Sequence, residues 1–520
     1  MRDRAESPAL WRLSIAVPKT GAVLSSPPGG RVSSNSRRIE IKVAENFQLP
    51  QTPIEQFTLA NGLRCVLSRD PVVPVVSVAV YYDVGSRNER VGRTGFAHLF
   101  EHMMFQGSEN VPKAAHFQYI FNAGGTMNGT TSTERTNYFE TLPANQLPLA
   151  LWLESDRMRS LKVTQENLDN QRQAVQEEKR LRYDNQPYIN AFLLINELIF
   201  KNPANAHSTI GSMEDLDAAT IDDVRDFFRI YYAPNNAVLT VVGDFDLKLA
   251  RELIDKYFAG IPSQPQPPPV DVSEPPEVAQ AKEIYHDKLA PAPAFILGWK
   301  IPPRRTPDHY ALSLAGDLLF SGDSSRLYQK LVKGDESVVS IQGEVDDRRG
   351  PSALYIFALP KPGEDPSAIR QQITNEIMKL GSEGPGQHEM EKLQNTLCND
   401  AVRGRQSTMF RAQRIAEHTI YDDDPTLFDH ELDYYLLVTA DQIREVTAKY
   451  LNTENRVILD IIPAAAPEAA AASEPASTPV AAEPPQPGSP APQIPASTSP
   501  DEALAVAAAP DQPDSEPVHP

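Results

Sequence analysis

Cysteine is almost absent from this chain of 520 residues, which contains only Cys65 and Cys398. The two residues lie far apart and in no spacing typical of metal ligands, which argues against a disulfide framework and against a cysteine-ligated metal. We therefore expect two buried thiols. Long apolar runs are also missing, because none approaches the roughly 20 residues that a helix needs to cross a bilayer. The sequence predicts no transmembrane helix.

Positive charge is in deficit, with 49 lysine and arginine residues against 69 aspartate and glutamate residues, a formal net charge of −20. No run of basic residues interrupts this acidic background. Because nucleic acids and anionic membranes are bound through clustered positive charge, we expect no nucleic acid partner and no attachment to an anionic membrane.

The two ends of the chain lack the pattern of a folded domain. Residues 1–45 contain Arg, Ser and Pro without periodicity, and their longest apolar core, Leu13–Val17, is too short for a signal peptide. Asp3 and Glu6 argue against a transit peptide. We interpret this segment as a disordered extension, or as the result of a start site placed too far upstream. Residues 464–520 are rich in Ala and Pro, with eight acidic residues and no Lys or Arg, and we expect a disordered acidic tail.

The centre of the sequence is the stretch Gly95–Phe105, which contains His98, Glu101 and His102. On a helix, two residues four apart lie one turn apart on the same face, and Glu101 lies on that face too. An isolated pair of histidines in this spacing is more often structural. With a carboxylate between them, the two imidazoles can hold a zinc ion and leave a base beside its bound water.

Hydrophobic periodicity and turn residues predict alternating strands and helices around this stretch. Thr94 is expected to cap the helix that carries His98, and Gly107 to end it. We expect the Thr-rich segment after Gly124-Gly125 to form strands at a sheet edge. The predicted strands are Glu55–Ser68 with a turn at Asn61-Gly62, Val75–Val84, Thr126–Glu140 and Ala237–Val242; the predicted helices are Ala115–Ala123, an amphipathic Leu147–Leu161, Thr164–Tyr183 and Ile221–Tyr231.

A third metal ligand is expected on the helix that Thr164 caps, which offers Glu177 and Glu178. Their helical neighbours distinguish them. Glu178 has apolar residues at positions i−4, i−3 and i+3, whereas Glu177 has Gln173 and Arg180 among its neighbours. Glu178 therefore faces the core more squarely, and a buried carboxylate needs a cation. Zinc would be that cation.

A Pro-rich stretch at 261–280 predicts a semi-rigid linker between two halves, 46–260 and 281–463. The halves resemble degenerate repeats, since Tyr231–Leu239 ends the first as Tyr450–Leu459 ends the second. Placing Phe105 on Phe320 puts His98, Glu101 and His102 opposite Ser313, Gly316 and Asp317. The second half thus keeps the helix and lacks the ligands, which suggests duplication followed by specialisation.

The order His-Leu-Phe-Glu-His is that of the inverzincins, and its surroundings resemble the pitrilysin/insulinase family of zinc peptidases. The resemblance extends from about residue 57 to residue 463. With two halves and a single predicted zinc site, the chain resembles both the bacterial short-chain branch and the mitochondrial processing peptidase branch. The segments that carry it are Asn61-Gly62-Leu63, Gly95–Gly107, Gly124–Asn128, Glu154–Met158 and Gln171–Arg180.

The resemblance implies an α+β fold with two homologous α/β domains, each an antiparallel-rich sheet with packed helices, enclosing a chamber. It implies zinc ligation by His98, His102 and Glu178, because Glu178 stands at the family's spacing, and a general base at Glu101. The family often has a glutamate seven residues before the third ligand, where this chain has Gln171. A second charge near the metal is therefore in doubt.

The same resemblance implies that Asn128, Gly129 and Thr130 belong to an edge strand that binds substrate by strand addition. Active family members also carry an Arg and a Tyr in the second half, after a start like Ser325-Arg326-Leu327-Tyr328. The matching positions here are Val332 and Val339, which cannot donate hydrogen bonds to an oxyanion. We expect a second family subunit to supply that pair, and Arg326 to be structural.

We expect a zinc-dependent endopeptidase that cleaves peptides or unfolded segments, as the zinc-bearing subunit of a heterodimer. One alternative is a processing peptidase that removes presequences, and another is a non-catalytic structural or chaperone-like subunit. Relatives of the last kind usually lose the metal ligands, which this chain keeps. Cleavage specificity does not follow from the sequence. Without a clear signal peptide, the bacterial periplasm and the cytoplasm both stay open.

Overall fold

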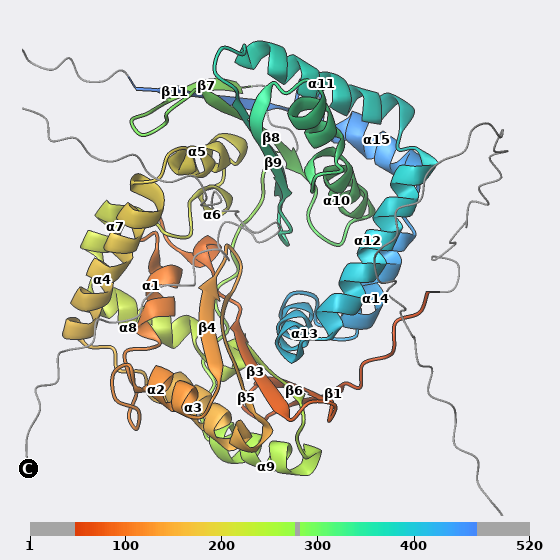
Figure 1. The fold of residues 1–520 in the computed structure, drawn as a ribbon. Helices are drawn as coiled ribbons and strands as arrows, with labels where there is room; N and C mark the ends of the chain where they lie inside the picture. The colour runs from red at the N-terminus through yellow and green to blue at the C-terminus, as the bar shows by residue number, and fades with distance from the viewer. Residues whose placement is uncertain (1–46, 276–280, 465–520) are drawn as a thin grey trace, which may run out of the picture. The chain divides into compact units, whose positions relative to one another are not determined.

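The computed structural model describes residues 47–275 and 281–464, so the predicted extension, the acidic tail and part of the linker lie outside the described residues. Two mixed sheets with many helices form the fold, as predicted (Figure 1). In the first sheet the order is β1-β2-β6-β3-β5-β4, and in the second it is β7-β11-β8-β10-β9. The strands of the first sheet are β1 Glu55–Thr58, β2 Arg64–Arg69, β3 Val75–Tyr82, β4 Thr126–Thr131, β5 Thr136–Pro143 and β6 Ala237–Gly243; those of the second are β7 Ala281–Asp287, β8 Ala294–Ile301, β9 Val338–Val345, β10 Ser352–Pro360 and β11 Val457–Pro463.

Apart from β1, which is added at the edge of the first sheet, the two sheets share one topology. Each has a single parallel pair, β2 with β6 and β7 with β11, and its other neighbouring strands are antiparallel. In the first sheet β6 lies between β2 and β3, and in the second sheet β11 lies between β7 and β8. The last strand of each half is thus inserted between two strands that are consecutive in sequence. Strands β6 and β8 are buried along their whole length, which explains why their sequences are apolar except for Thr240 and Lys300 and do not alternate. The predicted repeat is confirmed at the level of topology.

Helices cover the sheets in both halves. The first half contains α1 Phe96–Met103, α2 Ala115–Asn122, α3 Leu147–Ser160, α4 Gln165–Lys179, α5 Ile189–Ile199, α6 Pro203–Ala206, α7 Met213–Ala218, α8 Ile221–Tyr231 and α9 Leu247–Phe258. The second contains α10 Pro307–Phe320, α11 Pro366–Glu383, α12 Gln387–Arg405, α13 Thr408–Asp422, α14 Leu427–Leu436 and α15 Ala440–Tyr450.

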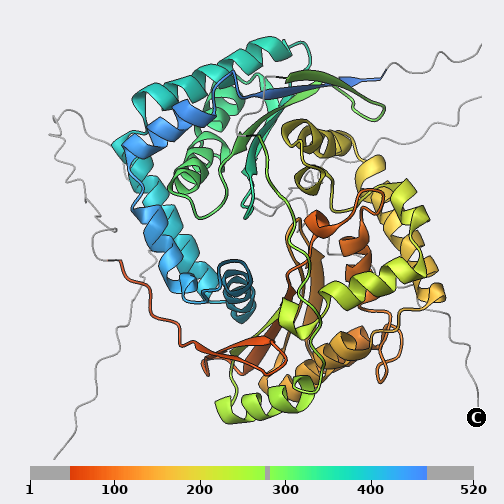
Figure 2. The same ribbon diagram turned by 180° about the vertical axis from the view of Figure 1, so that it is seen from behind.

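Each half contributes one helix to the sheet of the other half. Helix α5 buries Ala191, Ile195 and Ile199 against β8 and β11 of the second sheet. Helix α13 buries Ala412, Ile415 and Ala416 against β2, β3 and β6 of the first sheet, and Thr408 at its start shares a hydrogen bond with Ser77 (Figures 1 and 2). Burial of apolar surface on both helices therefore joins the two halves.

The described part of the Pro-rich stretch, residues 261–275, runs along the first half rather than standing free. The amide of Asn202 donates to the carbonyl oxygens of Asp271 and Ser273, and Asn205 donates to Val272 and Glu274. Both cysteines are buried and free, as predicted. Among the described residues, no helix is long and apolar enough to cross a bilayer.

Three details differ from the sequence prediction. Helix α1 ends at Met103, before Gly107, and Thr94 does not cap it. The Thr94 hydroxyl instead donates to Asp215, while the carboxylate of Glu89 binds the first amides of the helix. Helix α3 exists, but it is not simply amphipathic, because it buries a charged group of residues, Glu154, Asp156 and Arg157, as deeply as its apolar ones.

Candidate metal centre and active site

Helix α1 divides its side chains between a core face and a site face. The core face buries Phe96, Ala97, Leu99, Phe100 and Met103. The remaining residues are His98, Glu101 and His102, which the spacing places on one side of the helix. The rings of His98 and His102 lie 4.9 Å apart, nearly perpendicular to each other. Packing of the apolar face thus fixes the direction in which the polar face points.

Helix α4 lies beside α1 and brings a carboxylate to the two imidazoles (Figure 1). The Thr164 hydroxyl accepts a hydrogen bond from the amide of Asn167, so it caps α4 as predicted. Near the other end of the helix, Glu178 Oε2 lies 3.1 Å from His102 Nε2 and 3.6 Å from His98 Nε2. One ligand atom from each of the three residues lies within 4.8 Å of the others. We refer to His98, His102 and Glu178 as the His98 triad.

The choice between the two glutamates of α4 is clear in the structure. The Glu178 side chain is 15% exposed and faces α1, whereas that of Glu177 is 58% exposed and pairs with Arg180. After Lys179 the helix continues as a π-helical turn, Arg180–Asp184, from which Arg182 reaches Glu178 Oε1 at 3.3 Å. Arg182 therefore engages one carboxylate oxygen and leaves the other to the histidines.

The electrostatics of the triad favour the cation-binding protonation states of His98 and Glu178, whereas His102 is stabilised in its protonated form. Burial and the neighbouring His102 lower the pKa of His98. Burial opposes the ionisation of Glu178, but the hydrogen bond from His102 and the nearby imidazoles outweigh it and lower the pKa of Glu178. Burial likewise opposes the protonation of His102, but the carboxylates of Glu178 and Glu101 outweigh it and raise the pKa of His102. A metal ion would displace that proton, as metal binding to histidine generally does.

Glu101 is held beside the triad by the edge strand. Its Oε2 accepts a hydrogen bond of 2.7 Å from the Thr131 hydroxyl at the end of β4. Strand β4 is the last strand in the order of the first sheet, so its outer backbone edge has no strand partner among the described residues. A Cβ atom at Gly129 would lie 3.3 Å from Cγ of Glu101 and 3.0 Å from the Tyr138 ring, which shows how closely β4 approaches α1.

The three predicted substrate contacts all lie on β4. Asn128 pairs with Phe139, Gly129 with Tyr138 and Thr130 with Asn137 on the inner neighbour β5. The Thr130 hydroxyl donates to Asn137 Oδ1 at 2.6 Å, so its side chain is engaged within the sheet. What β4 offers to a ligand is therefore mainly its outer backbone, at the end closest to Glu101.

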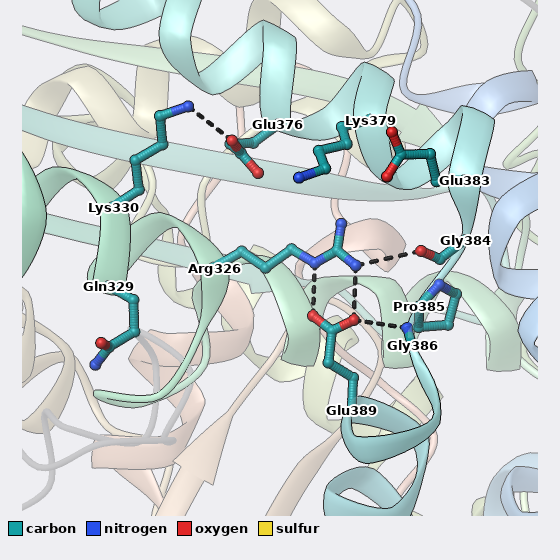
Figure 3. Close-up of a pocket in the computed structure, with 10 residues that line it drawn as sticks. All are labelled: Arg326, Gln329, Lys330, Glu376, Lys379, Glu383, Gly384, Pro385, Gly386 and Glu389. Atoms are coloured by element: carbon teal, nitrogen blue, oxygen red, sulfur yellow. Dashed lines mark hydrogen bonds and ion pairs between the residues drawn. The ribbon is translucent and has the colours of Figure 1, made fainter.

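Other positions singled out in the sequence have definite surroundings. Gln171 is buried and contributes a hydrogen bond that raises the pKa of His102. Val332 packs against the core of the second half, and Val339 on β9 is 55% exposed. The Arg326 guanidinium binds both carboxylate oxygens of Glu389 and the carbonyl of Gly384, which confirms its structural role (Figure 3). This ion pair lines a cavity of about 640 Å³ whose other lining residues are Gln329, Lys330, Glu376, Lys379, Glu383, Pro385 and Gly386.

Two residues that hold the site were missed in the sequence. Thr131 is two positions beyond Gly129 and therefore on the same face of β4, and this period could have identified it. Arg182 follows Glu178 by four residues, the spacing at which oppositely charged side chains meet on a helix. Both signals are present in the sequence, but neither is specific without knowledge of which face looks towards α1.

A second group of possible ligands lies in the core of the first half. One ligand atom each from His116 on α2, Glu140 on β5 and Glu154 on α3 lies within 4.8 Å of the others. All three are buried, and Arg157 forms an ion pair with Glu154. We refer to them as the His116 cluster. In the second half, by contrast, no such group includes a described residue of α10, where Ser313, Gly316 and Asp317 stand opposite the α1 residues.

Family models match both halves of the chain. Residues 64–210 match the family described as Insulinase (Peptidase family M16), and residues 218–397 match the domain described as Peptidase M16 inactive domain. The chain belongs to the insulinase family of peptidases. The matched regions agree with the structure, in which the His98 triad lies in the first half.

Insulinase-family relatives support this membership along most of the chain. Zinc protease PqqE of Helicobacter pylori is 29% identical over 409 residues, which cover 78% of this chain and 92% of that protein. The beta subunit of the mitochondrial-processing peptidase of Saccharomyces cerevisiae is 26% identical over 239 residues, which cover 45% of this chain and 50% of that subunit. The crystal structure of a protease from Helicobacter pylori has a TM-score of 0.76 and 26% identity, covering 80% of this chain and 100% of that one.

Proposed function

We propose that this chain is a zinc-dependent endopeptidase acting on peptides or unfolded protein segments. The observation that carries the proposal is the convergence of two imidazoles and one carboxylate, with Glu101 beside them and a free strand edge next to Glu101. Two neutral nitrogen ligands and one ionised oxygen ligand are a typical set for a catalytic zinc site with an open position. The names of relatives as zinc proteases point the same way.

The proposed roles follow from the geometry. His98, His102 and Glu178 would hold the zinc ion, which when bound would act as a Lewis acid on the scissile carbonyl. Glu101, held by Thr131, accepts a proton from the attacking water and returns it to the leaving amine. An extended substrate segment pairs with the outer edge of β4, with Asn128, Gly129 and Thr130 as the contacting residues. Because such pairing uses backbone groups, it selects for unfolded segments more than for sequence.

The test is cleavage of an unstructured fluorogenic peptide by the purified chain, alone and in the complex from its native host, together with measurement of its metal content. We expect about one zinc per chain, loss of cleavage on chelation, and recovery on addition of zinc. The His98→Ala variant should lose the metal and the activity. Cleavage that survives complete removal of metal would contradict the proposal, and so would a zinc content below one per chain that His98→Ala leaves unchanged.

We assign metal binding to an N-terminal domain at 46–260, followed by the linker at 261–280 and a homologous non-catalytic domain at 281–463. Strands β1 to β6 all belong to the first sheet and β7 to β11 to the second, which supports this division. The description of the second matched model as an inactive domain also supports it.

We further propose that the chain is the zinc-bearing subunit of a heterodimer. Val332 and Val339 offer only hydrocarbon where the family's active members carry an Arg and a Tyr, and Val332 is partly buried against the core of the second half. A partner would supply the missing donors. If the chain purified alone cleaves peptides at the full rate of the complex from its native host, the heterodimer is excluded while the peptidase proposal stands.

One variant of this function is presequence processing, which the similarity to the beta subunit of the mitochondrial-processing peptidase favours. It would be tested by comparing cleavage of a basic amphipathic presequence with that of a neutral unstructured peptide of the same length. A non-catalytic structural or chaperone-like role is less well supported, because the triad and Glu101 are all present and face one another.

A further inference from the structure

A side chain from outside the helix closes the N-terminus of α1. Glu89 follows a short 3₁₀ turn at Ser86–Asn88, and its side chain is fully buried. Its Oε2 accepts a hydrogen bond of 2.8 Å from the amide of Gly95, and its Oε1 accepts one of 2.8 Å from the amide of Ala97. The first amides of a helix have no partners within the helix, and its dipole favours a negative charge there. Glu89 thus performs the capping that Gly95, without a side chain, cannot.

His207 holds Glu89 from the opposite side. Its Nε2 lies 2.9 Å from Glu89 Oε2, and its Nδ1 lies 2.5 Å from the carbonyl oxygen of Pro203. The carbonyl of Pro203 can only accept. Burial raises the pKa of Glu89, but the two amide hydrogen bonds and the facing His207 oppose that rise and favour the ionised carboxylate, which also only accepts. Both ring nitrogens therefore donate, which makes His207 an imidazolium. Although burial opposes its charge, the hydrogen bond and the charge of Glu89 raise the pKa of His207.

The segment that follows His207 is packed directly on the start of α1. Gly95 and Gly211 both have positive φ, and a Cβ on Gly211 would lie 2.4 Å from the nitrogen of Gly95. The amide of Ser212 donates to the Thr94 hydroxyl, which in turn donates to Asp215. No room is left for the first turn of α1 to shift relative to this segment.

The metal ligands begin one residue after the last capped amide. Ala97 precedes His98, and α1 is only eight residues long, so its first turn sets the direction of both histidines and of Glu101. We propose that the buried ion pair of Glu89 and His207 is a positioning pair for the site, which fixes the first turn of α1 so that His98, His102 and Glu101 converge on the metal. This inference rests on the proposed function, because it assigns a role in metal binding and turnover.

The experiment compares Glu89→Gln and His207→Gln with His388→Gln, a matched control at an exposed histidine whose side chain is 79% accessible. Each is measured for Co²⁺ affinity, for the visible absorption spectrum of the Co²⁺ form, and for kcat and KM of peptide cleavage. Changes that disturb how ligands are held typically reduce metal affinity or activity by about 10- to 100-fold. We expect that range in Co²⁺ affinity and in kcat for both variants, an altered Co²⁺ spectrum, and little change in KM, because β4 is untouched.

The double variant separates a positioning pair from two independent structural contacts. If Glu89 and His207 act through one another, the double variant loses no more than the more severe single one. Native Co²⁺ affinity, spectrum and kcat in folded Glu89→Gln and His207→Gln would overturn the inference. If Glu89→Gln does not fold, His207→Gln decides alone. A parent chain that binds Co²⁺ but cleaves no peptide, either alone or in the complex from its native host, would refute the peptidase proposal and leave the Co²⁺ measurements to judge this one.

Discussion

The His98 triad and the His116 cluster both gather histidine and glutamate side chains within 4.8 Å, yet their glutamates differ in protonation. Partners lower the pKa of Glu178, whereas burial, followed by the charge of Glu154, raises the pKa of Glu140 well above its usual range. Among the described residues no donor hydrogen bonds to either oxygen of Glu140. The surroundings of the first glutamate thus favour the ionised form that binds a cation, and those of the second favour the protonated form.

The position of an arginine explains much of this difference. Arg182 reaches one oxygen of Glu178 and leaves the other to the two histidines. Arg157 instead binds both oxygens of Glu154, so that carboxylate has little left to offer a metal. Burial adds to the contrast, since the triad side chains are 12–25% exposed, whereas His116, Glu140 and Glu154 are nearly inaccessible. Proximity of ligand types therefore does not define a metal site; free lone pairs and a route for water are also needed.

The largest expected effect is that of Glu178→Gln. An amide in place of the ionised ligand should remove the metal and with it nearly all peptide cleavage, because two histidines alone bind zinc weakly. Glu177→Gln is the matched control, one residue away on the exposed face of α4, and should change neither. Metal content by atomic absorption and cleavage rates check both. Equal metal loss in the two variants would show that α4 is merely destabilised.

Glu101→Gln should separate turnover from metal binding. The amide can still accept the hydrogen bond from Thr131 but cannot take a proton, so we expect a fall in kcat of about 10² to 10⁴ with the zinc content unchanged. Single-turnover rates at saturating peptide, together with metal analysis, measure this. Retained turnover would remove Glu101 from the role of general base.

The fold was predictable where local pattern and packing agree. The strands predicted at Val75–Val84 and Ala237–Val242 are found as β3 and β6, and the Thr164 cap is where the sequence places it. The start of α1 was not predictable, because its capping group, Glu89, lies outside the helix, six residues before Gly95, and not at the usual capping position. The exchange of α5 and α13 between the halves also depends on contacts far apart in sequence, which no local pattern encodes.

The candidate site followed from spacing because the three residues of the His98 triad sit on two regular helices. His98 and His102 are one turn apart, and the neighbours of Glu178 indicate which way it faces. The His116 cluster could not be predicted, because its members come from α2, β5 and α3 and have no regular spacing. Glu154 and Arg157 are charged residues that α3 buries, contrary to the amphipathic pattern expected there.

A third prediction uses the buried ion pair of the His116 cluster. Glu154→Gln leaves Arg157 uncompensated in the core, where the two side chains are 0% and 2% exposed. Loss of one partner of a buried pair typically costs about 3–5 kcal/mol of unfolding free energy. Urea denaturation should show a loss of unfolding free energy near the lower end of that range, because Glu140 can ionise and partly compensate the charge of Arg157. The zinc content per folded chain should stay the same. A loss of zinc would place a metal in this cluster.

The smallest effect is expected for Glu140→Gln, and it depends on pH. Folding raises the pKa of Glu140, so the folded chain keeps a proton that the unfolded chain releases as the pH rises above the usual glutamate range. This residue therefore favours the folded state least at neutral and alkaline pH, and glutamine removes that dependence. We expect the variant to be within about 1 kcal/mol of the parent at pH 5 and to gain stability relative to it towards pH 8. Urea denaturation between pH 5 and pH 8 measures the difference in unfolding free energy, with Glu177→Gln as the exposed control. Parallel curves of unfolding free energy against pH for the parent and Glu140→Gln would mean that Glu140 is ionised in the core. The two clusters would then not differ as proposed.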